Sequence, residues 1–399
     1  MMTVRLDRIG LLLACLFQAA CVGGSGSPAT PTAAPAATLS AAALLGEKIF
    51  HDASLSATGR QACADCHDAA HALAAKDGLP ASLGGIDGVT QGTRNAPSLR
   101  YITQTPAFFF DAEGTPTGGF DRDGRVDTLS EQARRPFLSP VEMANADAAE
   151  VARRLSEAEY AADFRALFGE RIFEDPEAAF ERALFAIERY EREDSAEFAP
   201  FTSKYDNFLA GAASLSEAEM RGLSLFNDPQ KGNCAACHPS AKGPNGEPPL
   251  FTDFTYDNLG VPRNAAITAN ADPAFFDLGL CGPVRGDLAA RTDLCGAFKV
   301  PSLRNVALTA PYFHNGRFAT LKQAIEFYVR RDTHPQEFYP LDAAGRVLKF
   351  DDLPAAYRGN VNITEAPYNR LPGDLPALDA GEIADVVEFL HTLTDGYQP

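Results

Sequence analysis

The sequence contains two copies of the pattern Cys-x-x-Cys-His, and no other feature constrains the chain as strongly. The copies are Cys63–His67 and Cys234–His238. Two thiols one helical turn apart can form thioether bonds to the vinyl groups of a porphyrin, and the adjacent histidine then faces the iron. A zinc site would need four nearby nitrogen or sulfur ligands, and no second Cys or His pair lies beside either motif. The sequence therefore predicts two covalently bound haem c groups. The predicted thioether and axial residues are Cys63, Cys66, His67, Cys234, Cys237 and His238.

The first twenty residues have the layout of a secretory signal. Two arginines precede a short apolar run, and small residues lead into Cys21. The run is too short for a membrane span, which needs about 20 apolar residues. We therefore expect residues 1–20 to be a signal peptide for export to the periplasm and residues 21–40 to be a flexible linker. Two fates of Cys21 stay open, namely lipidation that tethers the protein to a membrane, or simple cleavage.

Composition and charge narrow the class of protein further. The chain has 399 residues, enough for two domains with separate cores. Its formal net charge of -18 argues against nucleic acid as a partner and is compatible with a basic partner surface or with solubility alone. Outside the haem motifs and the leader, only Cys281 and Cys295 remain. In an oxidising compartment we expect these two to form a disulfide.

Similar segments precede the two haem motifs. Residues 46–52 and 222–228 both read Gly-x-x-aliphatic-Phe-x-Asp. Ser216 and Glu219 form a capping-box pattern at the start of the helix that leads into the second segment. The shared pattern indicates an internal duplication of a haem-binding domain.

Helical periodicity dominates the remaining chain. Apolar residues recur at helical spacing in 146–168, 176–193 and 383–393, whereas strand-like alternation is scarce. The predicted fold class is therefore all-α, with two cytochrome-c-like haem domains in tandem and long loops that wrap the haems. The predicted domains are residues 41–205 and residues 206–399.

Further motifs give the chain a resemblance to a known family. They are Arg94–Leu99, Asp123–Arg125, Leu129 with Gln132, Pro136, Pro140–Met143, Phe298–Asn305 and Leu308–Gly316. Together with the haem motifs, they make the chain resemble the bacterial di-haem cytochrome c peroxidases and their MauG relatives, over about residues 45–393. The resemblance implies that hydrogen peroxide reacts at the N-terminal haem.

The resemblance places Gln132 and Glu142 over the distal face of that haem, with Pro136 beside them. Peroxide reduction needs a group that takes a proton from one oxygen and returns it to the leaving oxygen, which a nearby carboxylate can do. We expect Glu142 to be this acid/base and Gln132 to orient the oxidant; without the resemblance, both would be taken for surface residues. Family peroxidases hold a displaceable distal histidine where Gly85 stands here. We therefore expect an open position on this haem, with His71 at the surface.

For the second haem, the resemblance places the distal ligand fourteen residues after His314, at Tyr328. Family peroxidases have Met at this position, and MauG relatives have Tyr. A phenolate oxygen stabilises higher iron oxidation states than a thioether does. The alternative is that Tyr328 only packs on a helix.

The resemblance also implies a calcium ion between the haems. The implied ligands are the Asn95 side chain and the carbonyls of Thr309 and Pro311, all oxygen donors as a hard cation requires. The family's Trp between the haems is missing, since the chain has no Trp and Arg122 stands at that position. Three alternatives stay open for the electron route: a tyrosine relay, direct transfer between the haems, or weaker coupling than in the relatives.

These features predict a periplasmic di-haem c-type peroxidase. Hydrogen peroxide would be reduced at the N-terminal haem, with electrons passed through the C-terminal haem from a small redox protein such as a cytochrome c or a cupredoxin. One alternative is a MauG-like oxidase that modifies a partner protein through high-valent di-haem iron. Another is a di-haem electron carrier without catalysis. A homodimer is compatible with the sequence.

Overall fold

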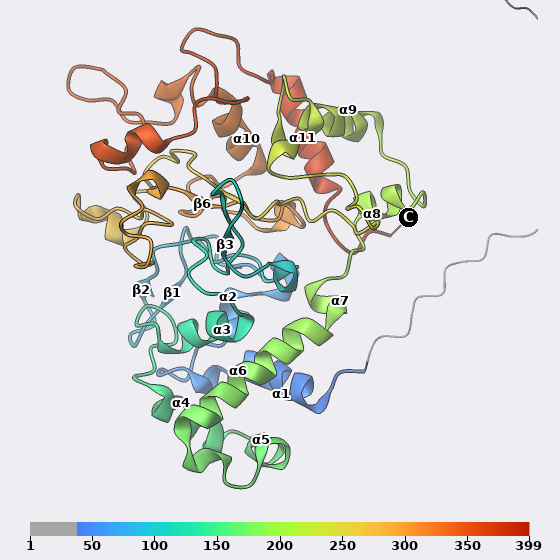
Figure 1. The fold of residues 1–399 in the computed structure, drawn as a ribbon, viewed down its shortest axis with the longest axis vertical. Coiled ribbons are helices and arrows are strands. Elements are labelled where there is room, and N and C mark those ends of the chain that lie inside the picture. The colour runs from blue at the N-terminus through green and yellow to red at the C-terminus, as the bar shows by residue number, and fades with distance from the viewer. Residues whose placement is uncertain (1–37, 399) are drawn as a thin grey trace, which may run out of the picture. The chain divides into compact units, whose positions relative to one another are not determined.

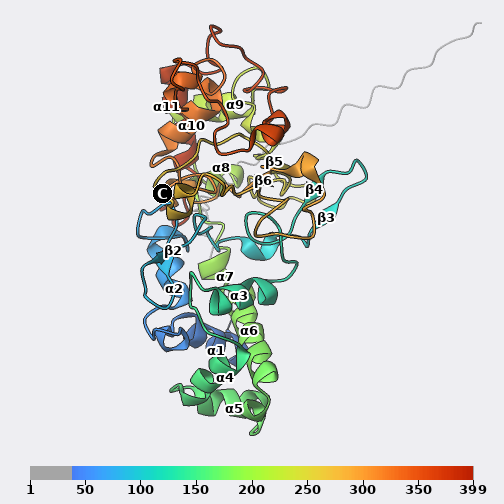
Figure 2. The ribbon, with the colours of Figure 1, turned by 90° about the vertical axis from the view of Figure 1, so that its left-hand side faces the viewer.

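Two groups of helices lie at opposite ends of the folded structure, with loops and short hairpins between them (Figures 1 and 2). The computed structural model describes residues 38–398, so the predicted signal peptide and Cys21 lie outside the described residues. The first group comprises α1 (Ala41–Phe50), α3 (Leu129–Leu138), α4 (Ala148–Glu157), α5 (Ala161–Phe168) and α6 (Pro176–Glu193). The second group comprises α9 (Glu217–Asn227), α10 (Leu321–Arg330) and α11 (Ala380–His391).

The remaining helices, strands and turns are short. The remaining α-helices are α2 (Cys63–Cys66), α7 (Ser195–Phe198) and α8 (Lys204–Leu209). Three antiparallel pairs join β1 (Leu83–Gly84) to β2 (Thr90–Gln91), β3 (Phe109–Phe110) to β4 (Pro116–Thr117), and β5 (Tyr256–Asp257) to β6 (Phe298–Lys299). The 3-10 turns are Ala53–Leu55, Ala69–His71, Ile102–Gln104, Ile172–Glu174, Cys234–Ala236, Thr268–Ala271, Thr292–Leu294, Val306–Leu308, Pro335–Glu337 and Ala355–Asn360. Among the residues described, no helix is long and apolar enough to span a bilayer.

The helices begin where the sequence provides caps. The Asp175 side chain accepts from the Ala178 amide, and Pro176 is the first residue of α6, a position that suits its fixed φ. The predicted capping box of Ser216 and Glu219 is present at the start of α9. The segment 146–168, however, forms two helices rather than one continuous helix. The backbone turns to an extended conformation at Ala158, and the Tyr160 hydroxyl donates to the Asp52 carboxylate at 2.7 Å.

Each helix group packs around one pair of helices that meet at a glycine. Gly46 of α1 lies against the backbone carbonyl of Ala186 in α6, so closely that a Cβ would collide with it. Gly222 of α9 lies in the same way against the carbonyl of Asp385 in α11. The two glycines are the first residues of the repeated Gly-x-x-aliphatic-Phe-x-Asp pattern. The helix pairs therefore repeat as the sequence does, while the division into two haem domains stays a prediction.

The phenylalanine of each repeat anchors an aromatic cluster. Phe50 packs edge-on against Tyr190 and Phe198, with ring centroids 5.7 and 6.3 Å away. Phe226 packs in the same manner against Phe251 and Phe389, at 6.2 and 5.2 Å. Edge-to-face pairs of this kind add specific geometry to the burial of apolar area. The clusters fix the ends of α1 and α9, from which the chain continues to the two Cys-x-x-Cys-His motifs.

A buried ion-pair network connects the two halves of the sequence. The Arg94 guanidinium donates to both carboxylate oxygens of Asp277, at 2.6 and 2.7 Å. It also lies 2.7 Å from the carboxylate of Asp123, which Arg125 contacts as well, at 2.9 Å. The side chains of Arg94, Asp277 and Asp123 are only 11, 7 and 0% exposed. The network therefore lies in a poorly solvated region where the loss of one partner leaves an uncompensated charge.

We predict that Gly46→Ala and Gly222→Ala each destabilise the protein by about 1–3 kcal/mol, because the added methyl group forces the paired helices apart. Thermal unfolding of the holoprotein measures the effect. Gly286→Ala is the matched control, since Gly286 has open space around its Cβ position. An unchanged melting temperature in both helix variants would contradict the close packing.

We predict that Arg94→Met destabilises the protein by about 3–5 kcal/mol, because two buried carboxylates lose their partner. Denaturant unfolding followed by circular dichroism provides the comparison. Arg171→Met is the control, because Arg171 pairs with Glu174 while its side chain is 85% exposed, and such a surface pair is worth about 0–1 kcal/mol. Equal losses of unfolding free energy in the two variants would contradict the prediction that the buried network stabilises the protein more than a surface ion pair does.

Candidate functional site

The two motif histidines are held in the same way. Nδ1 of His67 lies 3.0 Å from the carbonyl oxygen of Leu73, and Nδ1 of His238 lies 2.7 Å from that of Phe251. A carbonyl can only accept, so each Nδ1 bears the hydrogen and each Nε2 keeps a free lone pair. Burial lowers the pKa of both imidazoles. Both side chains are therefore neutral and have the protonation pattern that a metal ligand requires.

A repeated tetrapeptide fixes these carbonyls. Residues 97–100 and 301–304 both read Pro-Ser-Leu-Arg. In each copy the leucine amide donates to the carbonyl that also faces the histidine, at 3.1 and 3.3 Å. The serine hydroxyls donate to the carbonyls of Ala72 and Leu250, at 2.5 and 2.6 Å. Both copies lie within the motifs on which the resemblance rests, but their distances from the motif histidines differ, so sequence reasoning did not connect them with the imidazoles.

A cavity of about 330 Å³ lies beside the second haem motif. Cys234, Cys237 and His238 line it, together with Tyr328 and apolar residues of α10 and α11. Such a mostly apolar space with a few convergent polar groups is typical of a cofactor site. Two thiols, a neutral imidazole and an apolar wall fit a haem c. When bound, a haem supplies an iron that exchanges electrons, while the chain provides its attachment and its axial atoms.

Tyr328 of α10 is not the only tyrosine in this cavity. Its ring lies 6.1 Å from that of Tyr368, and both residues line the same space. Burial raises the pKa of both phenols above their usual value. Within residues 38–398, neither hydroxyl has a recorded hydrogen-bond partner. The predicted ligand therefore has a neighbour with the same chemistry, which sequence reasoning missed because Tyr368 lies in a loop without a motif.

The loop after α3 brings the predicted peroxide-site residues together. Gln132 and Pro136 lie four residues apart on α3, hence on one face of the helix. Pro136 has no N–H, so the helical hydrogen bond to the Gln132 carbonyl is not made. The Met143 amide donates to the Pro136 carbonyl at 3.1 Å, which folds the loop back along the helix. The Glu142 backbone, one residue before Met143, therefore lies close to Pro136.

Glu142 also lies near the first haem motif. Burial raises the pKa of the Cys63 and Cys66 thiols, and the negative charge of Glu142 contributes to the rise at both. Burial likewise raises the pKa of Glu142 itself, while a hydrogen bond from Ser139 opposes the shift. A carboxyl group with a raised pKa beside a reactive centre suits proton transfer near neutral pH.

Gly85 lies close to the chain around Glu142 on its backbone side. Its amide donates to the Glu142 carbonyl at 2.7 Å, and its φ of +77° lies in the left-handed region. A Cβ at this position would come within 2.9 Å of the Pro140 carbonyl and of the Thr90 side chain. The hairpin of β1 and β2 thus positions Glu142 and has no space for a larger residue at 85. His71, the other nearby histidine, is half exposed and pairs with Asp68 at 2.8 Å.

The three predicted calcium ligands, Asn95, Thr309 and Pro311, line one cavity together with Arg122. The Asn95 side-chain oxygen, however, accepts a hydrogen bond from Arg122 at 2.7 Å. Calcium at this place stays a prediction, and the contact of Arg122 with the same oxygen speaks against it.

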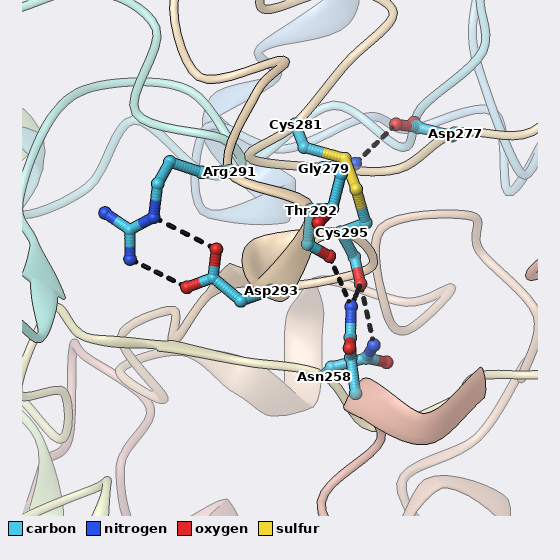
Figure 3. Close-up of a disulfide and its surroundings, with 9 residues drawn as sticks. Asn258, Asp277, Gly279, Cys281, Arg291, Thr292, Asp293 and Cys295 are labelled. Atoms are coloured by element: carbon cyan, nitrogen blue, oxygen red, sulfur yellow. Dashed lines mark hydrogen bonds and ion pairs between the residues drawn. A yellow bond between two sulfur atoms is a disulfide. The ribbon is translucent and has the colours of Figure 1, made fainter. Parts of the chain in front are cut away.

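Cys281 and Cys295 are joined in a disulfide, with 5.0 Å between their Cα atoms (Figure 3). The Asn258 side chain donates to the Cys295 carbonyl at 3.1 Å, and the Gly279 amide donates to Asp277 at 3.2 Å. Asp277 is the partner of Arg94, so the bridged loop is continuous with the network between the halves.

Comparison with known proteins gives a consistent result. A family model described as di-haem cytochrome c peroxidase matches residues 40–214. The chain is 38% identical to the methylamine utilization protein MauG of Paracoccus denitrificans, over 98% of this chain and 97% of that protein. It is 31% identical to the cytochrome c551 peroxidase of Nitrosomonas europaea, over 81 and 83% of the two chains.

A solved structure agrees with these sequence relatives. The diheme peroxidase BthA from Burkholderia thailandensis superposes with a TM-score of 0.81 at 41% identity, over 93% of this chain and 90% of that chain. The resemblance inferred from the motifs is thereby confirmed, as is the assignment to oxidoreductases of the peroxidase type. The chain belongs to the di-haem cytochrome c peroxidase and MauG family, and as a member of it binds two haem c groups.

Proposed function

We propose that the protein is a periplasmic enzyme that reduces hydrogen peroxide at the haem attached to Cys63 and Cys66. Electrons reach this site through the haem attached to Cys234 and Cys237, from a small redox protein such as a cytochrome c or a cupredoxin. The single observation that supports this most is the hairpin at Gly85, which binds the Glu142 backbone and leaves no room for a protein ligand from that position.

Within this site, the residues of the chain have separate tasks. The Glu142 carboxyl takes a proton from the proximal oxygen of the oxidant and delivers it to the leaving oxygen. Gln132, which is only 8% exposed, orients the oxidant by hydrogen bonding. Pro136 shapes the helix face between them. An electron carrier without catalysis would need none of these groups.

A second candidate function is favoured by Tyr328. A phenolate on the second iron stabilises higher oxidation states, which suits a MauG-like enzyme that oxidises a partner protein rather than a peroxidase that draws electrons from a carrier. Both functions use the same Glu142 site, so they differ in the electron donor. The acidic chain, with a formal net charge of -18, favours a basic donor surface. A lipid tether at Cys21 and a homodimer stay further proposals.

We predict that Glu142→Gln lowers the kcat for peroxide by about 10²–10⁴-fold with both haems retained, because the amide cannot relay a proton. The wild type should lose activity as the pH falls, at a higher pH than an ordinary glutamate would give, because burial raises the Glu142 pKa and protonation removes the base. The variant should lack this acidic limb. Steady-state assays across pH measure both effects.

The control is Glu157→Gln, which alters an exposed glutamate paired with Arg153 on α4 and should leave turnover and its pH profile unchanged. A Glu142→Gln enzyme with full haem content and wild-type turnover would sink the acid/base assignment. The protein would then still reduce peroxide, but without Glu142 as its acid/base.

We predict that Tyr328→Met converts the ferric spectrum of the second haem from oxygen-ligated to thioether-ligated, because the cavity then offers a sulfur donor. Tyr328→Phe should abolish the oxygen-ligand signature, while Tyr368→Phe should leave it in place. Electron paramagnetic resonance and optical spectra of the resting protein distinguish the variants. Loss of the signature only in Tyr368→Phe would transfer the ligand role to Tyr368.

A further inference from the structure

The guanidinium of Arg122 occupies both oxygens of Asn95. Its Nε donates to the Asn95 backbone carbonyl at 2.8 Å, and its Nη2 donates to Oδ1 at 2.7 Å. Asn95 is buried, and its backbone N–H donates to the His314 carbonyl at 2.8 Å. The amide oxygen that a metal ion would use is therefore already the acceptor of a charge-assisted hydrogen bond.

The backbone holds Arg122 in this position from both sides. The Lys299 amide of β6 donates to the Arg122 carbonyl at 2.9 Å. Asp121 before it has a φ of +63°, and Asp123 after it is bound by Arg94. The guanidinium is thus placed by the fold rather than by its contact with Asn95 alone.

Arg122 lies among positively charged side chains, and the nearby carboxylates already have other partners. In the described part of the chain, no ion pair joins Arg122 to a carboxylate, and burial together with Arg94 lowers its pKa to about 10. It remains charged at neutral pH. Lys299 is a second cation nearby, half-buried, with its pKa lowered to about 8 by burial. The carboxylates of the adjacent residues Asp121 and Asp123 already pair with Arg125.

A calcium ion does not fit this arrangement. Calcium takes six to eight oxygen ligands at about 2.3–2.6 Å, and Asn95 Oδ1 is the one side-chain oxygen among the predicted protein ligands, so the predicted site depends on it. Coordination to Asn95 Oδ1 would place a dication against a guanidinium that shares the same oxygen. Two positive charges at this distance repel strongly in a poorly solvated site.

We propose that the Arg122 guanidinium takes the place of the cation between the two haem sites, and that the protein binds no calcium at Asn95, Thr309 and Pro311. A fixed side chain then supplies the positive charge that an exchangeable ion would supply. Arg122 lines the cavity beside the second haem motif, where the carboxylates of a bound haem would supply anionic charge. The integrity of the centre becomes independent of the calcium concentration.

The first test uses the wild-type holoprotein after gel filtration into buffer containing EGTA. We expect elemental analysis to find two irons and no calcium per chain. The resting spectrum and peroxide turnover should be the same before and after EGTA, and with added CaCl₂. Calcium at about one ion per chain, whose removal changes the resting spectrum, would overturn the proposal.

The second test frees the Asn95 oxygen. Arg122→Leu should gain a calcium site of about one ion per chain, measured by calorimetric titration with CaCl₂ and by a calcium-dependent resting spectrum. Arg122→Lys, which keeps a positive charge, should bind none. Arg171→Leu, which alters an exposed arginine between α5 and α6, is the control and should also bind none. If Arg122→Leu binds no calcium, the guanidinium is not what excludes the ion, and the proposal fails.

These measurements do not depend on the proposed function. Metal content and calcium titration are read without turnover, so a protein inactive toward peroxide would still decide the question. If Arg122→Leu does not fold with two haems, the calcium content of the wild type and its response to EGTA remain decisive.

Discussion

The buried position of Arg94 between two carboxylates determines how the two halves of the chain meet. Asp277 comes from the C-terminal half and Asp123 from the N-terminal half, and one guanidinium binds both. The segment that begins at Arg94 continues to Leu99, whose amide fixes the Leu73 carbonyl. That carbonyl in turn orients a motif imidazole. The alignment of His67, the predicted ligand of the first iron, is therefore linked to an ion pair between residues that are 183 positions apart in the chain.

Features that depend on neighbouring residues could be predicted from the sequence. The haem motifs, the family, the capping box at Ser216 and the duplicated segments all rest on patterns a few residues long. The break between α4 and α5 was not predicted, and beside it the Tyr160 hydroxyl donates to Asp52, which is 108 residues away in the chain. The pairing of Arg94 with Asp277 was equally hidden, since 183 residues separate them.

The candidate site shows the same limit. The residues Gln132, Pro136 and Glu142 were predicted from a family resemblance. The structure adds how their backbone is held, by the Gly85 hairpin and the return of the loop to α3. The carbonyls that fix the histidines leave no trace in residue identity, because any residue has a carbonyl. Arg122 was noticed as a departure from the family, but its effect on Asn95 depends on side-chain geometry that no alignment position reveals.

The disulfide has a consequence for the maturation of the protein. The loop that it closes contains Arg285, whose guanidinium donates to the carbonyls of Asp123 and Gly124 at 2.9 Å each. A bond between cysteines persists only where the surroundings are oxidising. The loop that carries these contacts between the halves is therefore expected to be closed by its disulfide only in oxidising surroundings, and to stay open in a reducing compartment.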